Sequence, residues 1–280
     1  MKKIILTLAI VALSTAFASA QDMSVATETA KGANEALVAK DYAAALAGFK
    51  EALTQAEACG EDGAELVETC KGVIPSIILS IAKGEIKDAE YDKGLATLAE
   101  AIEAATKYGA DDVLEDANVL IPQVKKQKAN SLFSAKDFAA AAEAFKELVE
   151  ADPTDGVSAL RLGMALNSTG DKDGAVAALE AAAANGQEAN AKKQLSNIFL
   201  KDGQALLKEK KFKEALEALM KSNGYVESAN AYKLAVNCAS NLKDYKAAVE
   251  YSQKYLDLSP NAQDAEQVKK NIEAFKALIK

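Results

Sequence analysis

The chain has 280 residues, of which 50% are hydrophobic, and its 41 acidic side chains against 33 basic ones give a net charge of −8. Nucleic acid is not expected as a partner. Phosphate binding needs clustered Lys and Arg, and this chain has a single arginine, Arg161. Alanine dominates the hydrophobic residues and tryptophan is absent, a composition that favours helices over sheets.

The first 20 residues have the three parts of a secretory signal peptide. Lys2 and Lys3 form a basic start, residues 4–13 an apolar run, and residues 18–20 (Ala-Ser-Ala) a small-residue cleavage site before Gln21. The apolar run is too short to span a bilayer, and no later stretch is long enough. We therefore expect residues 1–20 to be removed and the rest to be exported to the periplasm, with no transmembrane segment.

A phrase recurs along the remaining chain. It reads AKDYAAALAGF at residues 39–49 and AKDFAAAAEAF at residues 135–145, with weaker copies at 210–219 and 243–252. Repetition at intervals of a few tens of residues is typical of small helical units that stack in a row. We expect each copy to be the second helix of a pair, with a first helix just before it.

Two patterns within the phrase predict how the pairs form. An aspartate stands at the turn between the two helices, where it can cap the second one; these residues are Asp41, Asp137, Asp171 and Asp244. A small residue is followed four positions later by a large one, on the same helix face, so that neighbouring helices can pack closely. The pairs are Ala45 with Phe49, Ala141 with Phe145, Ala175 with Leu179, and Ala215 with Leu219.

The first two units are longer than the others, and their extra length is itself repeated. Residues 65–75 align without gaps to residues 112–122, and both segments end in proline, Pro75 and Pro122. This alignment predicts first helices extended at their N-terminal ends, with a kink or a restart at each proline.

With these features the sequence resembles the tetratricopeptide repeat (TPR) family. The units at residues 129–153 and 159–186 carry the resemblance best, the latter with Leu-Gly at 162–163 and Gly-Asp at 170–171, and Pro153 and Pro260 end their units. The resemblance implies an all-α fold, a TPR-like α-solenoid of about six helix pairs plus a C-terminal capping helix. We expect one repeat domain over 21–280.

Within this domain we expect elongated units over about 25–122, ordinary units over about 123–260 and the capping helix over 261–280.

No residue constellation suited to catalysis is present. The absence of histidine removes Ser-His-Asp and Cys-His catalysis and HExxH zinc sites. No Gly-rich phosphate loop occurs, and the carboxylate pair at 111–112 is expected in a solvated connector. A calcium-like string at 169–180 lacks its first carboxylate, because Thr169 stands there. We therefore expect no enzyme, no cofactor and no metal.

The three cysteines are Cys59, Cys70 and Cys238. Export permits a disulfide between Cys59 and Cys70, which flank a short connector. However, the rise per residue places Cys70 roughly 9 Å further from the connector, along its helix, than Cys59 is along its own. A disulfide needs the two cysteines closer together than this. The sequence leaves the two states open, and predicts Cys238 as a buried small hydrophobe.

The resemblance also implies candidate peptide-binding residues on the first helices. Lys126 and Asn130 are one helical turn apart, and Lys233 and Asn237 repeat the pair. In some members of the family, such a pair and further basic residues on the next two first helices clamp the C-terminal carboxylate of a peptide. Here those basic residues would be Arg161 and Lys201. The alternative is that these side chains only solvate a groove.

The sequence thus predicts an exported, non-enzymatic scaffold that binds a protein or peptide partner through the concave face of a helical-repeat superhelix. The alternative function is a structural or assembly component of a cell-envelope complex. The identity of the partner, the oligomeric state and the choice between a periplasmic and an extracellular location stay open.

Overall fold

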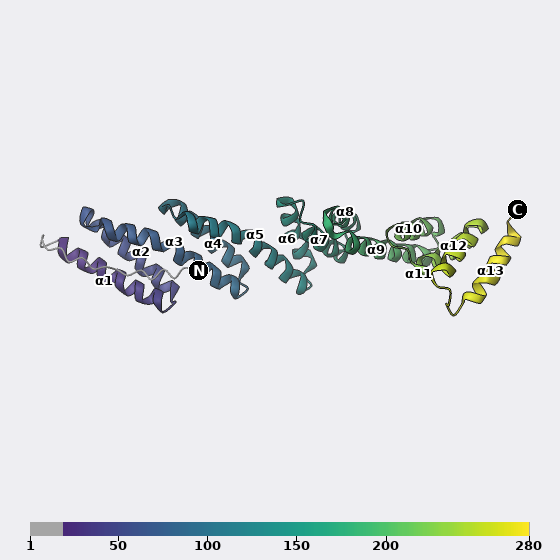
Figure 1. Ribbon diagram of the computed structural model, residues 1–280, viewed down its shortest axis with the longest axis horizontal. Helices are drawn as coiled ribbons and strands as arrows, with labels where there is room; N and C mark the ends of the chain where they lie inside the picture. The colour runs from purple at the N-terminus through teal and green to yellow at the C-terminus, as the bar shows by residue number, and fades with distance from the viewer. Residues whose placement is uncertain (1–18, 280) are drawn as a thin grey trace. The chain divides into compact units, whose positions relative to one another are not determined.

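The computed structural model describes residues 19–279, which form helices and short connections with no strand among them (Figure 1). The expected all-α fold is therefore confirmed. The predicted signal peptide lies almost entirely outside the described residues. The chain divides into two compact units, one ending at Gln127 and the other starting at Lys128.

The first unit is a run of helices in which each packs on the next. In chain order its elements are α1 (Ser19–Val38), α2 (Tyr42–Ala58), the 3-10 turn η1 (Gly60–Gly63), α3 (Ala64–Lys87), α4 (Tyr91–Tyr108) and the first part of α5 (Asp111–Ser134). Alanine is the most frequent residue of its core, and Phe49, Ile74 and Leu98 are among the large side chains that are 0–1% exposed.

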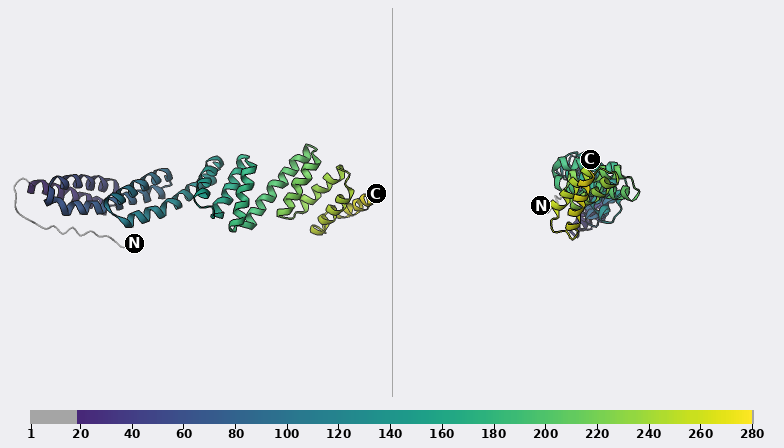
Figure 2. Two further views of the ribbon diagram at one scale, coloured as in Figure 1. Left: turned by 90° about the horizontal axis from the view of Figure 1, so that it is seen from above. Right: turned by 90° about the vertical axis from the view of Figure 1, so that its right-hand side faces the viewer.

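The second unit repeats the same arrangement, and its hairpins are seen from another side in the left view of Figure 2. After the end of α5 its elements are α6 (Phe138–Ala151), α7 (Gly156–Thr169), α8 (Lys172–Ala182), the π-turn η2 (Ala183–Gln187), α9 (Glu188–Lys208), α10 (Phe212–Tyr225), α11 (Ala229–Asn241), α12 (Tyr245–Leu258) and α13 (Ala265–Leu278). Each unit is thus a stack of antiparallel helix pairs, the α-solenoid arrangement. We call α1, α3, α5, α7, α9 and α11 the first helices and α2, α4, α6, α8, α10 and α12 the second helices.

The aspartates at the inter-helix turns cap the second helices as predicted. Each carboxylate accepts a hydrogen bond from the backbone N–H three residues later, which satisfies a donor that the helix leaves unpaired. The distances are 3.1 Å at Asp41, 3.2 Å at Asp137, 2.9 Å at Asp171 and 3.0 Å at Asp244.

The residue before the N-cap position of each second helix has a left-handed backbone, and in most pairs it is not glycine. The φ values are 64° at Lys40, 62° at Ala89, 63° at Lys136, 60° at Lys210 and 60° at Lys243. A left-handed residue just after the first helix is a common way to end it, and glycine is the residue that adopts it without steric cost. In the pair formed by α7 and α8, Gly170 takes this place with φ 92°.

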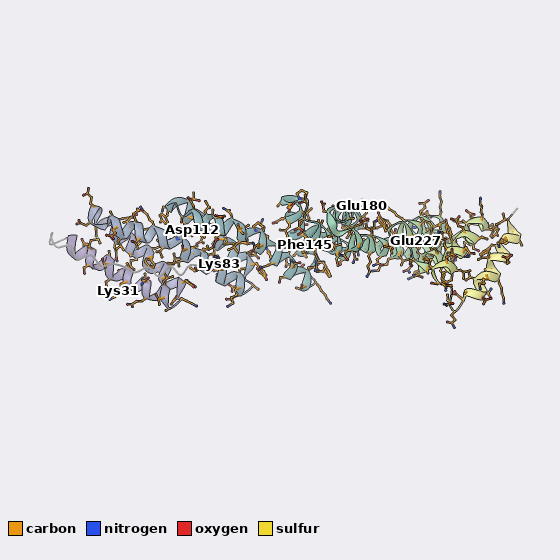
Figure 3. All side chains as sticks on the ribbon, viewed as in Figure 1. Lys31, Lys83, Asp112, Phe145, Glu180 and Glu227 are labelled. Atoms are coloured by element: carbon orange, nitrogen blue, oxygen red, sulfur yellow. The ribbon has the colours of Figure 1, made fainter. Side chains whose placement is uncertain are left out.

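The small-and-large pairs of the repeated phrase form the contacts between helices, as predicted. All eight side chains are 0% exposed, and Phe145 is labelled on the second unit in Figure 3. Glycine makes the closest approaches possible: a Cβ added at Gly163 would lie 2.6 Å from Leu179 Cγ, and one at Gly203 would lie 2.7 Å from Leu219 Cγ. The first helix therefore contacts its partner through its own backbone at these positions.

The extended first helices are also confirmed, because α3 and α5 have 24 residues each. At Pro75 and Pro122 the sequence predicted a kink or a restart, and no restart occurs, because both prolines lie inside continuous helices. One missing backbone hydrogen bond does not end a helix that tertiary packing holds on both sides. Around Pro75, Ile74 is 1% and Ile78 is 3% exposed.

Candidate functional site: the inner wall of the second unit

The first helices of the second unit lie side by side. Cα atoms of α7 and α9, and likewise of α9 and α11, approach within 8 Å, whereas no two second helices come together to a similar extent in the described part of the unit. A stack of hairpins whose first helices are closer together is concave on the first-helix side. We call the exposed faces of α7, α9 and α11 the inner wall.

The exposed face of α9 is a stripe of lysines. α9 packs on α8 and α10, and α7 and α11 flank it, so its remaining open face belongs to the inner wall. Exposed residues recur there at intervals of four, four, four and three positions, which places them on one face of a helix; they are Lys193, Asn197, Lys201, Ala205 and Lys208. Within residues 19–279, these three lysines form no ion pair.

Polar and apolar residues continue the wall on both sides of α9. On α11 the exposed positions at helical spacing are Asn230, Lys233, Asn237 and Asn241. On α7 the corresponding stripe is more apolar, with exposed Val157 and Ser168 at its ends and half-buried Arg161 and Met164 between them. The wall therefore offers amides, ammonium groups and a small apolar area to a partner.

Acidic residues are nearly absent from the helices that form this wall. α7 and α11 contain none, and the two on α9 are already paired. Glu188 accepts from Lys192 over 2.6 Å, and Asp202 accepts from Lys172 at the start of α8. The wall is thus positive within a chain whose net charge is negative.

The structure places four of the predicted binding residues on the wall, but not in equivalent environments. Lys201 and Asn237 are exposed on α9 and α11. Arg161 is half-buried, with its guanidinium carbon 5.0 Å from the centre of the Phe133 ring of α5, a cation–π contact. Asn237 accepts a hydrogen bond of 2.9 Å from Asn241 through its side-chain oxygen.

Lys233 is engaged by the neighbouring helix. Its Nζ donates over 2.6 Å to Asp264 Oδ2, and Tyr255 donates its hydroxyl to the other oxygen of the same carboxylate. These hydrogen bonds lower the pKa of Asp264 below its usual value, and the bond to Asp264 raises the pKa of Lys233. Lys233 therefore joins α11 to the start of α13 besides facing the wall.

The pair at Lys126 and Asn130 lies on α5, where the division between the two units falls between its members. Lys126 is half-buried in the first unit, and Asn130 is exposed in the second. Their role in binding stays a prediction.

Sequence reasoning missed Lys193 and Lys208, which flank Lys201 on the same helix face. Their spacing of eight and seven residues around Lys201 is a signal of a shared helical face. The family's pattern of a Lys and an Asn one turn apart does not include these two positions.

The three cysteines, Cys59, Cys70 and Cys238, are free thiols in the structure. Cys59 lies at the end of α2 with its Sγ 3.3 Å from Gln55 O, whereas Cys70 is 0% exposed inside the core of the first unit. Cys238 is buried as predicted. Burial raises the pKa of the Cys70 and Cys238 thiols to about 11.

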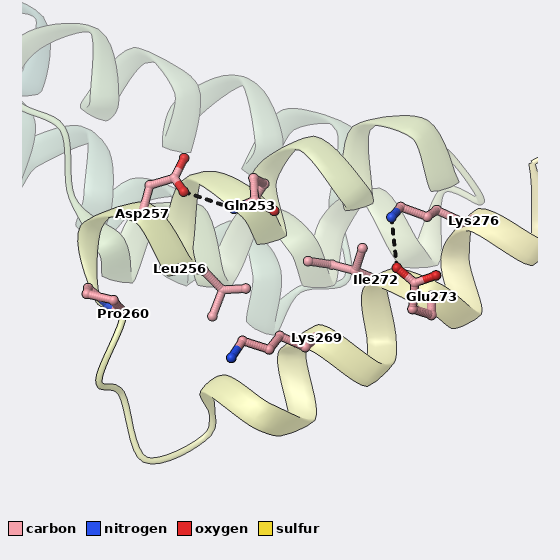
Figure 4. A pocket seen from close by; sticks show the side chains of 8 residues that line it. All are labelled: Gln253, Leu256, Asp257, Pro260, Lys269, Ile272, Glu273 and Lys276. Atoms are coloured by element: carbon pink, nitrogen blue, oxygen red, sulfur yellow. Dashed lines mark hydrogen bonds and ion pairs between the residues drawn. The ribbon is translucent and has the colours of Figure 1, made fainter.

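A cleft of about 410 Å³ lies between α12 and α13 (Figure 4). Leu256 and Ile272 are its apolar lining, and polar residues at its edge already pair with one another: Gln253 donates to Asp257 over 2.9 Å and Lys276 to Glu273 over 2.8 Å. Polar groups that converge on a ligand mark a binding pocket, and here they are satisfied within one helix each. The inner wall is therefore the better candidate.

Two further properties of the described helices bear on the site. Among residues 19–279, every helix is too short or too polar to cross a membrane. In the same residues, no cluster of acidic and cysteine side chains is suited to hold a metal ion. Asp171, from the calcium-like string, caps α8 instead.

Two stretches of the chain match models of a known family, both described as tetratricopeptide repeat: residues 132–198 and residues 229–262. The chain contains tetratricopeptide repeats. The first match runs from the end of α5 into α9 and the second from α11 to the end of α12, so the matched repeats include the helices of the inner wall.

Solved TPR structures resemble this chain only distantly. A crystal structure of MamA protein has 18% identity and a TM-score of 0.38, covering 65% of this chain and 90% of its own. YrrB, described as a TPR protein with an unusual peptide-binding site, has 17% identity and a TM-score of 0.34, with coverage of 69% and 91%. PilW, described as a type IV pilus biogenesis factor, has 17% identity and a TM-score of 0.34, with coverage of 70% and 98%. A comparison with curated protein sequences finds no match.

Proposed function

We propose that this chain is a non-enzymatic scaffold that binds a protein or peptide partner along the inner wall of its second unit. The observation that carries the proposal is the open face of α9, which is flanked by two other first helices and has exposed residues along its whole length. Packing between the repeats does not use these side chains. A shallow surface of several helices, contacted at many points, suits an extended partner.

Site-specific photo-crosslinking in intact cells tests this proposal. A photo-reactive amino acid replaces Asn197, at the centre of the wall on α9, or Glu217, which is exposed on the second helix α10. We expect a discrete crosslinked protein from position 197 and none from position 217. Adducts from position 217 alone would instead support a structural assembly held through the second helices, the alternative function.

We further infer that the chain is exported to the periplasm. The basic start, the apolar run and the small-residue site within residues 1–20 support this, and the third of these predicts cleavage after Ala20. Sequencing of the purified cellular protein would then begin at Gln21. A protein that retains Met1 or Lys2 would contradict export through this signal.

A further inference from the structure

We infer that the segment bound on the inner wall is acidic, a stretch of a partner protein rich in Asp and Glu. This inference rests on the proposed function and adds the chemical class of the partner. It begins from Lys193, Lys201 and Lys208, which are exposed on one face of α9 and have no ion pair in the described residues. Across 15 residues of helix these ammonium groups spread over roughly 22 Å. About seven residues of an extended peptide cover that length.

The second helices show what an ordinary solvated surface of this protein looks like. α10 mixes Lys213 and Lys221 with Glu214 and Glu217 along its length. α12 mixes Lys246 and Lys254 with Glu250 and Asp257 in the same way. Interspersed charges of both signs are usual on exposed helices. The inner wall departs from this pattern, because its open lysines have no acidic neighbours on α7 or α11.

Three carboxylates that border the wall are each paired with a lysine. Lys192 neutralises Glu188 on α9, Lys172 neutralises Asp202, and Lys233 neutralises Asp264. None of these three lysines belongs to the stripe of Lys193, Lys201 and Lys208. The bordering carboxylates therefore leave the stripe's charge uncompensated, and complementary carboxylates must come from another molecule.

Asparagine completes the recognition surface. Asn197 stands between two lysines of the stripe, and Asn230 and Asn237 are exposed on the adjoining helix α11. A side-chain amide both donates and accepts, so it can bind the backbone of an extended peptide whatever its sequence. Amides would hold the backbone, and the lysines would select acidic side chains.

The protein as a whole disfavours a nucleic acid as this ligand. Acidic and basic residues are equal in number from Lys128 onward, so the negative excess lies in the remainder of the chain. Binding to a phosphate backbone relies on long-range attraction and on many phosphate contacts, which a negative chain with one short basic stripe does not supply. A protein segment of about seven residues needs only the stripe.

The experiment measures fluorescence anisotropy with two labelled peptides of about 12 residues, long enough to span the stripe. One peptide alternates Glu with Ser, and the other has Gln in place of every Glu. We expect the Glu peptide to bind roughly tenfold more tightly, since three exposed ion pairs each contribute modestly. Raising the salt to about 300 mM should remove most of the difference.

Matched variants assign this preference to the wall. In the test variant, K193Q, K201Q and K208Q are combined; in the control, K213Q, K246Q and K254Q remove the same charge from exposed positions of second helices. The test variant should bind both peptides equally, and the control should keep the preference. Equal losses in both variants, or no preference for the Glu peptide in the unmodified protein, would overturn the inference.

Other occupants give different results. Tighter, wall-dependent binding of a single-stranded RNA of similar length would show a polyanion site instead, and concentration-dependent self-association that the test variant abolishes would show a second copy of this chain. Either result overturns the acidic-segment inference. A crosslink from position 197 without a preference for the Glu peptide would leave the proposed function standing and remove only its acidic partner.

Discussion

Lys233 on α11 donates a hydrogen bond of 2.6 Å to Asp264, the residue just before α13. A lysine predicted to hold a partner's carboxylate is thus already bound to a carboxylate of its own chain. The first helices of the matched repeats therefore differ in what they offer: α11 keeps its lysine paired, whereas α9 leaves three lysines open. We therefore expect a partner to contact α9 more than α11.

Acid should loosen α13. The hydrogen bonds from Lys233 and Tyr255 lower the pKa of Asp264 in the folded state. The stabilisation of the fold by the ionised Asp264 is therefore present above its ordinary pKa of 3.8 and is lost as the pH falls through the lowered pKa. Hydrogen exchange of α13, corrected for the intrinsic rate, should rise selectively in that range. In Asp264→Asn the helix should exchange faster already near neutral pH and show a smaller further change. An identical pH response in both proteins would contradict this linkage.

Gly163→Ala should destabilise the second unit. The added Cβ would lie 2.6 Å from Leu179 Cγ and 3.1 Å from Ala175 O, and Leu179 is fully buried. Overpacking of this kind costs about 1–3 kcal/mol, which a urea titration measures.

Gly224→Ala is the matched control, because Gly224 is an exposed helical glycine with nothing within 4 Å of the added Cβ. Here the better helix propensity of alanine should stabilise by up to about 1 kcal/mol. Equal effects of the two substitutions on stability would show that the close approach of the helices is not the reason why position 163 requires glycine.

Lys136→Gly should stabilise the protein even though it removes a side chain. Lys136 has a left-handed backbone with φ 63°, which costs a residue with a Cβ about 1 kcal/mol relative to glycine. Lys146→Gly, at an exposed position inside α6, should instead destabilise by roughly the same amount. Thermal unfolding of the two variants checks the opposite signs, and a loss of stability in both would contradict the turn geometry.

The thiols should titrate as three free groups. In the native protein Cys70 and Cys238 should resist alkylation at neutral pH, because both are 0% exposed and their pKa values are raised to about 11. Partially exposed Cys59 should react first, and slowly, since desolvation and the nearby carboxylates of Asp22 and Asp62 raise its pKa. After unfolding without reductant, all three should react. A single reactive thiol would instead reveal a bridge between Cys59 and Cys70.

Packing between the repeats was predictable from the sequence, because equivalent positions in the copies of the repeated phrase make equivalent contacts. Alignment of the copies predicted the Asp137 cap and the burial of Ala141 with Phe145, and the structure confirms both. The left-handed conformation at Lys136 was not predictable in this way, since the turn imposes it on a residue that does not favour it.

The candidate site was less predictable, because it lies where the copies differ. Lys201 was identified from its sequence position. Lys193 and Lys208 are recognised as candidate binding residues only from the helix packing that leaves one face of α9 open. Lys233 and Asp264 are 31 positions apart in the sequence, so no local sequence pattern predicts their ion pair. Whether a side chain on the wall is open or already paired thus depends on tertiary contacts.

Lysine footprinting tests the central claim most directly. The partner recovered by crosslinking is added to the purified protein, and an amine-reactive reagent labels exposed lysines with and without it. We predict that Lys193, Lys201 and Lys208 become protected, whereas Lys213, Lys246 and Lys254 on the second helices label at unchanged rates. Protection of the second-helix lysines with no change on α9 would contradict binding at the inner wall.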